Sequence, residues 1–448
     1  MNKPRWPSVA LVAAAAACLA AAAPAAEQQR TCPMGREYYL YTPDNLDPAK
    51  TYWLVVGVHG KGGNGKGACG MARWAAKGTV IVAGPSCPDG YQRLLHETDK
   101  QVLGIAAALR KEFRLYPKFF IYGFSGGAQF AHRFTLKHPD QVIGCSAHSA
   151  GTWTDSINAQ AASVPFAISC GENDTEKSTP LAPLGRHEWC QKFAGKLADA
   201  DFYFKVRFWP GVAHNSSRGS ARMTEDCFVL ATTGMHEPER QAVEKELQAV
   251  LPLIGAGRFA EAMEQLRKLV GAAAAPAPAD APAAPPASGS TRPTAGLSGP
   301  GAQPPVLPTA GQAGRATSRQ EVLTDTGAST GVQESSPPAA AGPAAPPADE
   351  GTRLAGLQEN AWGWRENAAA RAALARMRRL YVEEQAAALT RQMEKAAIEK
   401  IAAIEDAPPA DAAARLDAIA GTFADNPAVA AAVAKARANL KNPPPRKP

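Results

Sequence analysis

The stretch Phe119-Phe120-Ile121-Tyr122-Gly123-Phe124-Ser125-Gly126-Gly127-Ala128-Gln129-Phe130 decides the fold class of this chain. An apolar, aromatic run leads into Gly-x-Ser-x-Gly, and an amphipathic run follows at once. This pattern predicts a buried strand, a sharp turn with Ser125 at its apex, and a helix. Gly123 and Gly127 lack the side chains that would clash where strand and helix pass closely. We therefore expect Ser125 to stand on a strained turn, with the Gly126 N–H and the helix N-terminus directed at a bound anion.

Two further stretches of the chain resemble this motif. Gly327-Ala328-Ser329-Thr330-Gly331 lies in a Pro/Ala/Gly/Ser tract with no strand before it. Ala147-His148-Ser149-Ala150-Gly151 follows an apolar run, but no helical pattern comes after it. Because the motif has meaning only between a strand and a helix, Ser125 is the expected nucleophile and Ser149 is the alternative.

Apolar runs of strand length lie on both sides of the opening stretch. They occupy residues 37–41, 53–58, 80–83, 142–145, 164–169 and 203–208. Between the third run and the opening stretch, apolar residues recur at helical spacing at Val102, Ile105, Leu109 and Phe113. The run at 53–58 is continuous, as in a central parallel strand, whereas the run at 203–208 alternates as an edge strand does. Strands alternating with helices predict an α/β fold, with a mostly parallel sheet and helices on both faces.

The first 25 residues have the composition of a secretory signal peptide. Lys3 and Arg5 precede an apolar core, and Ala23-Pro24-Ala25 offers a cleavage site. We therefore expect an exported protein, periplasmic or secreted. Seven cysteines remain after the signal, and in an oxidising compartment some of them should pair, although the sequence does not say which.

The chain changes character after the predicted catalytic domain, residues 27–235. Two apolar helical faces separated by Gly255-Ala256-Gly257 predict a helical hairpin at 236–271. Residues 272–353 are rich in Ala, Pro, Gly, Ser and Thr, and this composition predicts a disordered linker. An alanine-rich helical region follows at 354–440. We expect these last helices to be tethered, to play no part in building the active site, and to serve self-association or attachment to the cell envelope.

A serine nucleophile needs a base, and the base needs an orienting carboxylate. In α/β-hydrolases these partners follow the serine in the order acid, then histidine, from loops after later strands. The run at 164–169 leads into Cys170-Gly171-Glu172-Asn173-Asp174, and the run at 203–208 leads to His214. Position therefore selects Asp174 and His214, with Glu172 as the alternative acid.

The other candidate bases are less well placed than His214. His187 precedes the last strand, and His236 lies beyond the domain. His132 and His138 belong to the helix after Ser125, where a histidine is more often solvated or part of the core.

The glycine-rich loop at 59–65 follows the first central strand. It is the expected source of a second oxyanion donor, the backbone N–H of Lys61, which would act together with that of Gly126. No Cys/His spacing typical of a zinc site occurs, and a net charge of +7 is diffuse over the chain. We expect no metal, no cofactor and no nucleic-acid partner.

Six motifs together resemble the α/β-hydrolase family of secreted polyhydroxybutyrate depolymerases and feruloyl esterases. They are Tyr39-Leu40-Tyr41-Thr42-Pro43, His59-Gly60, Gly123-Phe124-Ser125-Gly126-Gly127, His138-Pro139-Asp140, Gly171-Glu172-Asn173-Asp174 and Gly211-Val212-Ala213-His214. The resemblance covers about residues 35–230 and implies a Ser125–His214–Asp174 triad that cleaves carboxylic esters without metal or cofactor. Lys61 departs from the family, which has a smaller or uncharged residue there, and no polymer-binding domain is evident.

Two other functions are compatible with the same residues. One is a peptidase of the prolyl-oligopeptidase type, which shares the fold and the serine. The other is a cell-envelope interaction protein in which the helical C-terminal half carries the function and the hydrolase domain is vestigial.

Overall fold

The computed structural model of the chain describes residues 26–70, 72–75, 78–180, 182–274, 367–404 and 409–441. The predicted signal peptide at 1–25 lies outside the described residues. So do residues 275–353 of the predicted linker, with the second Gly-x-Ser-x-Gly copy, and residues 354–366 of the predicted helical region.

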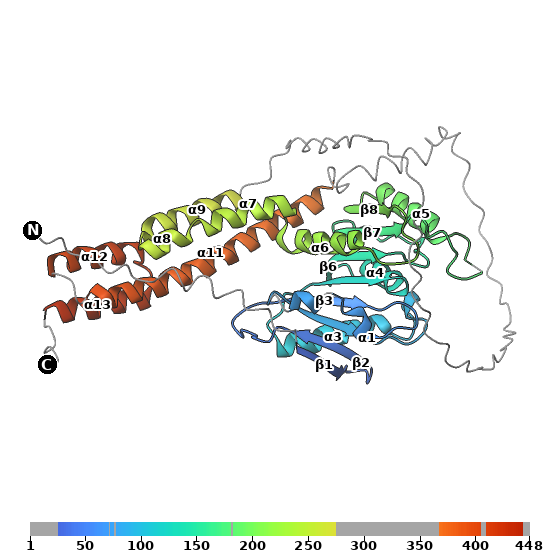
Figure 1. The fold of residues 1–448 in the computed structure, drawn as a ribbon, viewed down its shortest axis with the longest axis horizontal. Helices are drawn as coiled ribbons and strands as arrows, with labels where there is room; N and C mark the ends of the chain where they lie inside the picture. Colours follow the sequence, from blue (N-terminus) through green and yellow to red (C-terminus); the bar gives the residue numbers. More distant parts are fainter. Residues whose placement is uncertain are drawn as a thin grey trace, which may run out of the picture. The chain divides into compact units, whose positions relative to one another are not determined.

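Eight strands form one sheet in the order β1-β2-β4-β3-β5-β6-β7-β8 (Figure 1). They are β1 (Ala26–Thr31), β2 (Glu37–Thr42), β3 (Trp53–Val58), β4 (Val80–Pro85), β5 (Phe119–Phe124), β6 (Val142–His148), β7 (Phe166–Gly171) and β8 (Phe204–Trp209). β1 pairs antiparallel with β2, and β2 pairs antiparallel with β4, whereas all pairs from β4 to β8 are parallel. This is the strand order of the α/β-hydrolase fold, so the predicted fold class is confirmed. β8 is an edge strand, as its alternation predicts.

Helices follow the strands along the chain. Those of the sheet domain are α1 (Gly65–Ala68), α2 (Ala72–Ala75), α3 (Thr98–Glu112), α4 (Gly126–Lys137), α5 (Arg186–Asp199) and α6 (Arg218–Thr233), with short 3-10 turns η1 (Tyr91–Arg93) and η2 (Ala159–Ala161). The later helices are α7 (Glu237–Gln248), α8 (Leu251–Ala256), α9 (Phe259–Ala274), α11 (Ala368–Ile404), α12 (Pro409–Thr422) and α13 (Pro427–Lys441). None of the described helices is both long enough and apolar enough to cross a membrane.

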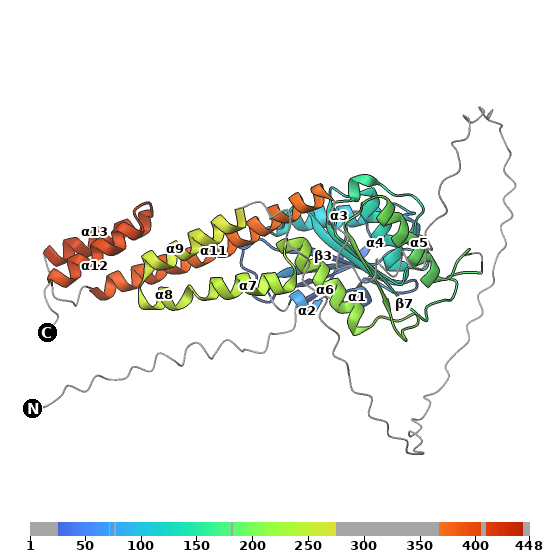
Figure 2. The ribbon, with the colours of Figure 1, turned by 90° about the horizontal axis from the view of Figure 1, so that it is seen from above.

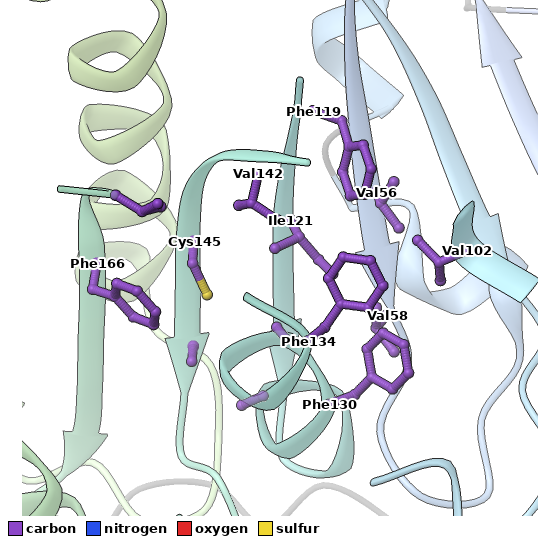
Figure 3. Packing of buried hydrophobic residues seen from close by; sticks show 14 of the residues in the cluster. Val56, Val58, Val102, Phe119, Ile121, Phe130, Phe134, Val142, Cys145 and Phe166 are labelled. Atoms are coloured by element: carbon purple, nitrogen blue, oxygen red, sulfur yellow. The ribbon is translucent and has the colours of Figure 1, made fainter. Parts of the chain in front are cut away.

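The sheet has a separate apolar core on each face, because successive side chains of a strand point to opposite sides. Ile121 of β5 packs with Phe130 and Phe134 of α4 in the core shared with α3 and α5 (Figure 3). Phe120, the preceding residue, lies in the other core and meets Phe228 of α6 edge to face at 5.5 Å. Burying each of these rings contributes about 2–3 kcal/mol. β5 is thus fixed from both faces, and the position of the turn at its carboxyl end is fixed with it.

The hairpin α7–α9 and the helices α11–α13 bury their apolar faces in one common core. Figures 1 and 2 show α8 and α9 running alongside α11. Phe259 of α9 and Phe423, which follows α12, have ring centroids 5.6 Å apart, and Met393 of α11 is fully buried in the same core. Narrow apolar stripes are stable only when covered, and here each helix covers the next.

The first turns of α11 also pack on the sheet domain, where the sequence predicts only a tether. Ala370 is fully buried in the core beneath α6. A Cβ added to Gly234, at the end of α6, would lie 2.0 Å from the carbonyl oxygen of Leu374, so the two backbones are in direct contact. The predicted boundaries at 236–271, 272–353 and 354–440 remain predictions.

All seven described cysteines carry free thiols, in contrast to the expected pairing. The structure gives a physical reason for several of them. Cys145 and Cys190 belong to the core under α4 and α5, whereas Cys69 and Cys227 belong to the core under α2 and α6, so the sheet separates the two groups.

Candidate active site

Ser125 lies at the apex of the turn between β5 and α4. Its backbone is held at φ 56° and ψ −117°, a conformation that costs a residue with a side chain about 1–3 kcal/mol. The flanking glycines allow this turn. A Cβ on Gly123 would lie 2.3 Å from the Gly127 carbonyl carbon, and a Cβ on Gly127 would lie 2.0 Å from the Val58 carbonyl oxygen. The strained turn expected from the sequence is therefore present, and it exposes the Ser125 hydroxyl to the loops beyond the sheet.

His214 belongs to the loop after β8 and reaches Ser125 across the end of the sheet. Its Nε2 lies 2.9 Å from Ser125 Oγ. The imidazole packs against the ring of Phe124 at a centroid distance of 4.9 Å. His148, at the end of β6, binds the Asn215 carbonyl through Nε2 at 2.9 Å, which fixes the residue next to His214. The base is thus oriented by packing on one side and by its own loop on the other.

Asp174 follows β7 and completes the chain of hydrogen bonds. Its Oδ2 accepts from His214 Nδ1 at 2.9 Å, and the residue is only 1% exposed. Since the carboxylate accepts the Nδ1 proton, Nε2 is left with a lone pair for the Ser125 hydroxyl. Burial alone would raise the pKa of Asp174, but the hydrogen bond from His214 and the charges of His214 and Arg186 together lower it below its usual value. Asp174 is therefore ionised at neutral pH.

Lys61 lies next to Gly126, the residue that follows the nucleophile, and the oxyanion role of the two residues remains a prediction. A Cβ on Gly126 would lie 3.0 Å from the backbone nitrogen of Lys61, so the two backbones are close neighbours. The Tyr91 hydroxyl holds this loop by donating to the His59 carbonyl at 2.5 Å. His59 Nε2 accepts from the Cys87 N–H at 2.9 Å, and burial lowers the pKa of His59, which keeps this acceptor unprotonated.

The alternative nucleophile and acid are placed differently. Ser149 is fully buried, and the neighbouring His148 Nε2 already donates to the Asn215 carbonyl, so Ser149 has no base there. Glu172 is exposed, and its backbone N–H is bound to the Trp209 carbonyl. The structure brings Asp174, and not Glu172, to the histidine.

The other candidate histidines have partners of their own. His132 is fully buried in α4 and accepts from the Thr154 N–H. His138 lies 2.9 Å from an oxygen of Asp99, and His187 packs against the ring of Phe208 with the two rings tilted by 42°. His236 precedes α7 and is the N-cap residue of that helix. Among the described residues, no group of three or more His, Cys, Asp or Glu side chains could hold a metal ion.

Two residues near the triad were missed by the sequence reasoning. His148 stands at the carboxyl end of the strand beside β5, and that position could have identified it. Arg186 begins α5 and contacts Asp174, but no motif or periodicity marks it.

The sheet domain is similar to several solved hydrolase structures. One is poly(aspartic acid) hydrolase-1 from Sphingomonas sp. KT-1, with 22% identity, covering 46% of this chain and 98% of that chain at a TM-score of 0.37. Another is a ferulic acid esterase from Anaeromyces mucronatus, with 14% identity, covering 45% of this chain and 89% of that chain at a TM-score of 0.38. A third is an acetyl xylan esterase from Aspergillus awamori, with 19% identity, covering 44% of this chain and 97% of that chain at a TM-score of 0.34. No protein-family model and no curated protein sequence matches the chain. The roles of the site residues therefore rest on their geometry.

Proposed function

We propose that this protein is a serine hydrolase that cleaves carboxylic esters through an acyl-enzyme intermediate. One observation carries the proposal. Two hydrogen bonds of 2.9 Å join Ser125 Oγ to the His214 imidazole and the imidazole to Asp174 Oδ2, and Ser125 lies on a strained turn. A nucleophile, a base and an orienting acid in this geometry are what acyl transfer requires.

In the first half of the reaction, Ser125 Oγ attacks the ester carbonyl carbon while His214 Nε2 takes the hydroxyl proton. Asp174 keeps the imidazole in the required tautomer and stabilises the imidazolium. The negative charge on the carbonyl oxygen faces the N–H groups of Gly126 and Lys61, and each such donor contributes about 3–4 kcal/mol to transition-state stabilisation. The carbon–oxygen bond to the alcohol then breaks, and the alcohol leaves with the proton from His214.

In the second half, water takes the place of the alcohol. His214 removes a proton from the water as its oxygen attacks the acyl-enzyme. The bond to Ser125 Oγ breaks, Ser125 recovers the proton from His214, and the carboxylic acid is released. Every proton moved in this cycle passes through Nε2, so the cycle depends on the tautomer that Asp174 maintains.

The sequence supports a place for this activity outside the cytoplasm. The residues before the domain have the pattern of a secretory signal, and we propose export to the periplasm or the medium. The similarity of six motifs to secreted depolymerases and feruloyl esterases favours esters over amides. A peptidase with the same triad is the second candidate.

The test combines a covalent probe with a substrate panel. The full-length protein and its Ser125→Ala variant are treated with a fluorophosphonate and assayed on short and long acyl esters, feruloyl esters and aminoacyl amides, all chromogenic. Labelling at Ser125 with ester turnover supports the proposal. Turnover of the amides alone would assign a peptidase. If the protein shows no labelling and no turnover, hydrolase function is refuted and an interaction role for the chain is favoured.

A further inference from the structure

The carboxylate of Asp174 is shared between His214 and a buried arginine. Arg186 Nη1 lies 3.3 Å from Asp174 Oδ1, while Oδ2 receives the His214 hydrogen bond. The same nitrogen of Arg186 also donates to the Glu176 carbonyl at 3.2 Å. The side chains of Arg186 and Asp174 are 13% and 1% exposed, so water screens this ion pair only weakly.

The chain holds Arg186 in this position by its backbone. The Arg186 N–H donates to the Glu176 carbonyl at 3.1 Å, and the His187 N–H donates to the Asp174 carbonyl at 2.9 Å. A Cβ on Gly185 would lie 2.1 Å from the Thr175 carbonyl oxygen, so only glycine permits this approach. The start of α5 is therefore bound directly to the loop that carries the acid.

We propose that Arg186 is a positioning residue that tunes the triad by occupying one oxygen of Asp174 and leaving the other to His214. This assignment rests on the proposed function, because it concerns the same catalytic histidine. Within the part of the chain that the structure describes, Arg186 is the permanent cation paired with this carboxylate.

Three further titratable groups near the pair are uncharged near neutral pH. They are Cys170, whose Sγ lies 3.5 Å from Asp174 Oδ2, with Cys190 and His148. Burial raises the pKa of both thiols, that of Cys170 to about 12, and lowers the pKa of His148. Arg186 therefore opposes the field of Asp174 at His214, and these three groups add no charge of their own near neutral pH.

The sign of the effect on catalysis follows from this charge balance. Burial raises the pKa of Asp174, and the charge of Arg186 helps to lower it, so the carboxylate that orients His214 stays ionised to lower pH. Removing the cation makes Asp174 easier to protonate. This change moves the acid limb of the activity profile to higher pH.

The test is the pH dependence of kcat/KM on an ester, and of the rate of fluorophosphonate labelling, for the full chain and three variants. Arg186→Gln removes the charge, and Arg186→Lys retains it. Lys192→Gln removes an equal charge from the exposed side of the same helix. We expect the acid limb of Arg186→Gln to shift to higher pH by about one unit. The acid limbs of Arg186→Lys and Lys192→Gln should stay at the wild-type position.

Labelling reports only on folded molecules, so the profile is measurable even if Arg186→Gln folds in low yield. If Arg186→Gln lowers the rate equally at all pH values and leaves the acid limb unmoved, the proposal is overturned and Arg186 has a purely structural role. A wild-type protein that is neither labelled nor active would instead overturn the proposed function itself.

Discussion

The side-chain nitrogen of Asn367 donates a hydrogen bond of 2.7 Å to the backbone carbonyl of Asp201. The same nitrogen reaches the Ala162 carbonyl at 3.3 Å, and the Asn367 side-chain oxygen accepts from the Ala370 N–H at 2.8 Å. One residue thus begins α11 as its N-cap and attaches that helix to two loops of the sheet domain. Because Asn367 is only 6% exposed, these bonds are largely shielded from water.

Asn367→Ala should lower the stability of the protein without affecting its chemistry. The cap contributes about 1 kcal/mol, and loss of the bond to the Asp201 carbonyl costs about a further 1 kcal/mol, whereas the Ala162 carbonyl keeps the Tyr203 N–H as a donor. Asn426 caps α13 through the Val429 N–H, with no contact to the sheet domain in the hydrogen bonds of the described residues, and Asn426→Ala is the matched control. Thermal unfolding should show a clearly larger drop in Tm for Asn367→Ala, with kcat/KM within about twofold of wild type. Equal drops would mean that the contact to the sheet domain contributes nothing.

Ser125→Ala should reduce kcat by about four to six orders of magnitude, because the nucleophile and the proton path are lost together. The fold should remain, since alanine fits the space of serine. Ser149→Ala is the control. Its hydroxyl lies 3.8 Å from Cys170 Sγ in a buried position, so its loss should cost about 1 kcal/mol of stability and leave activity within an order of magnitude. Labelling of Ser149 by a fluorophosphonate would contradict the assignment.

Asp174→Asn should cost about a thousandfold or more in kcat. An amide nitrogen facing Nδ1 would force the proton onto Nε2, so His214 could no longer accept from Ser125. Glu172→Gln, an isosteric change two residues away on the exposed side of the same loop, should leave kcat within a few-fold. Steady-state kinetics at neutral pH distinguishes the two, and the reverse ranking would transfer the role to Glu172.

The strands of this fold are predictable from sequence where they are buried and apolar. The apolar runs that predict β3 and β5 match the observed strands closely, because both strands are covered on both faces. β1 was missed. Its sequence, Ala-Glu-Gln-Gln-Arg-Thr, has no apolar alternation, and it exists as a strand because its backbone pairs with β2. A strand held by backbone pairing at a sheet edge leaves no pattern in its side chains.

The candidate triad is predictable because each member follows a recognisable strand. Topology brings the ends of β5, β7 and β8 to one edge, and Ser125, Asp174 and His214 lie just beyond those ends. The contacts of Arg186 and Asn367 could not be predicted, because no local sequence pattern indicates which distant residues they meet. Asn367 meets a carbonyl 166 residues earlier in the chain, and its own sequence context indicates only a helix cap.

The protein should lose stability on mild acidification through its buried neutral histidines. Burial lowers the pKa of His132 well below its usual value, and it also lowers the pKa of His59, His148 and His236. An unfolded histidine has a pKa of about 6.5 and takes up a proton below that pH, whereas the folded ones do not. Their stabilising effect is therefore fully present above about pH 6.5 and is lost as the pH falls below it, at up to about 1.4 kcal/mol per pH unit for each histidine.

His132→Gln tests this mechanism, since glutamine does not titrate and can still accept from the Thr154 N–H. Urea unfolding at about pH 7.5 and about pH 5.5 gives the loss of unfolding free energy between the two conditions. That loss should be smaller in His132→Gln than in wild type by about 1.4 kcal/mol, the contribution of one histidine that protonates only when unfolded. His96→Gln, at an exposed position, should leave the loss unchanged. If His132→Gln lowers stability equally at both pH values, His132 contributes packing and hydrogen bonding but not acid sensitivity.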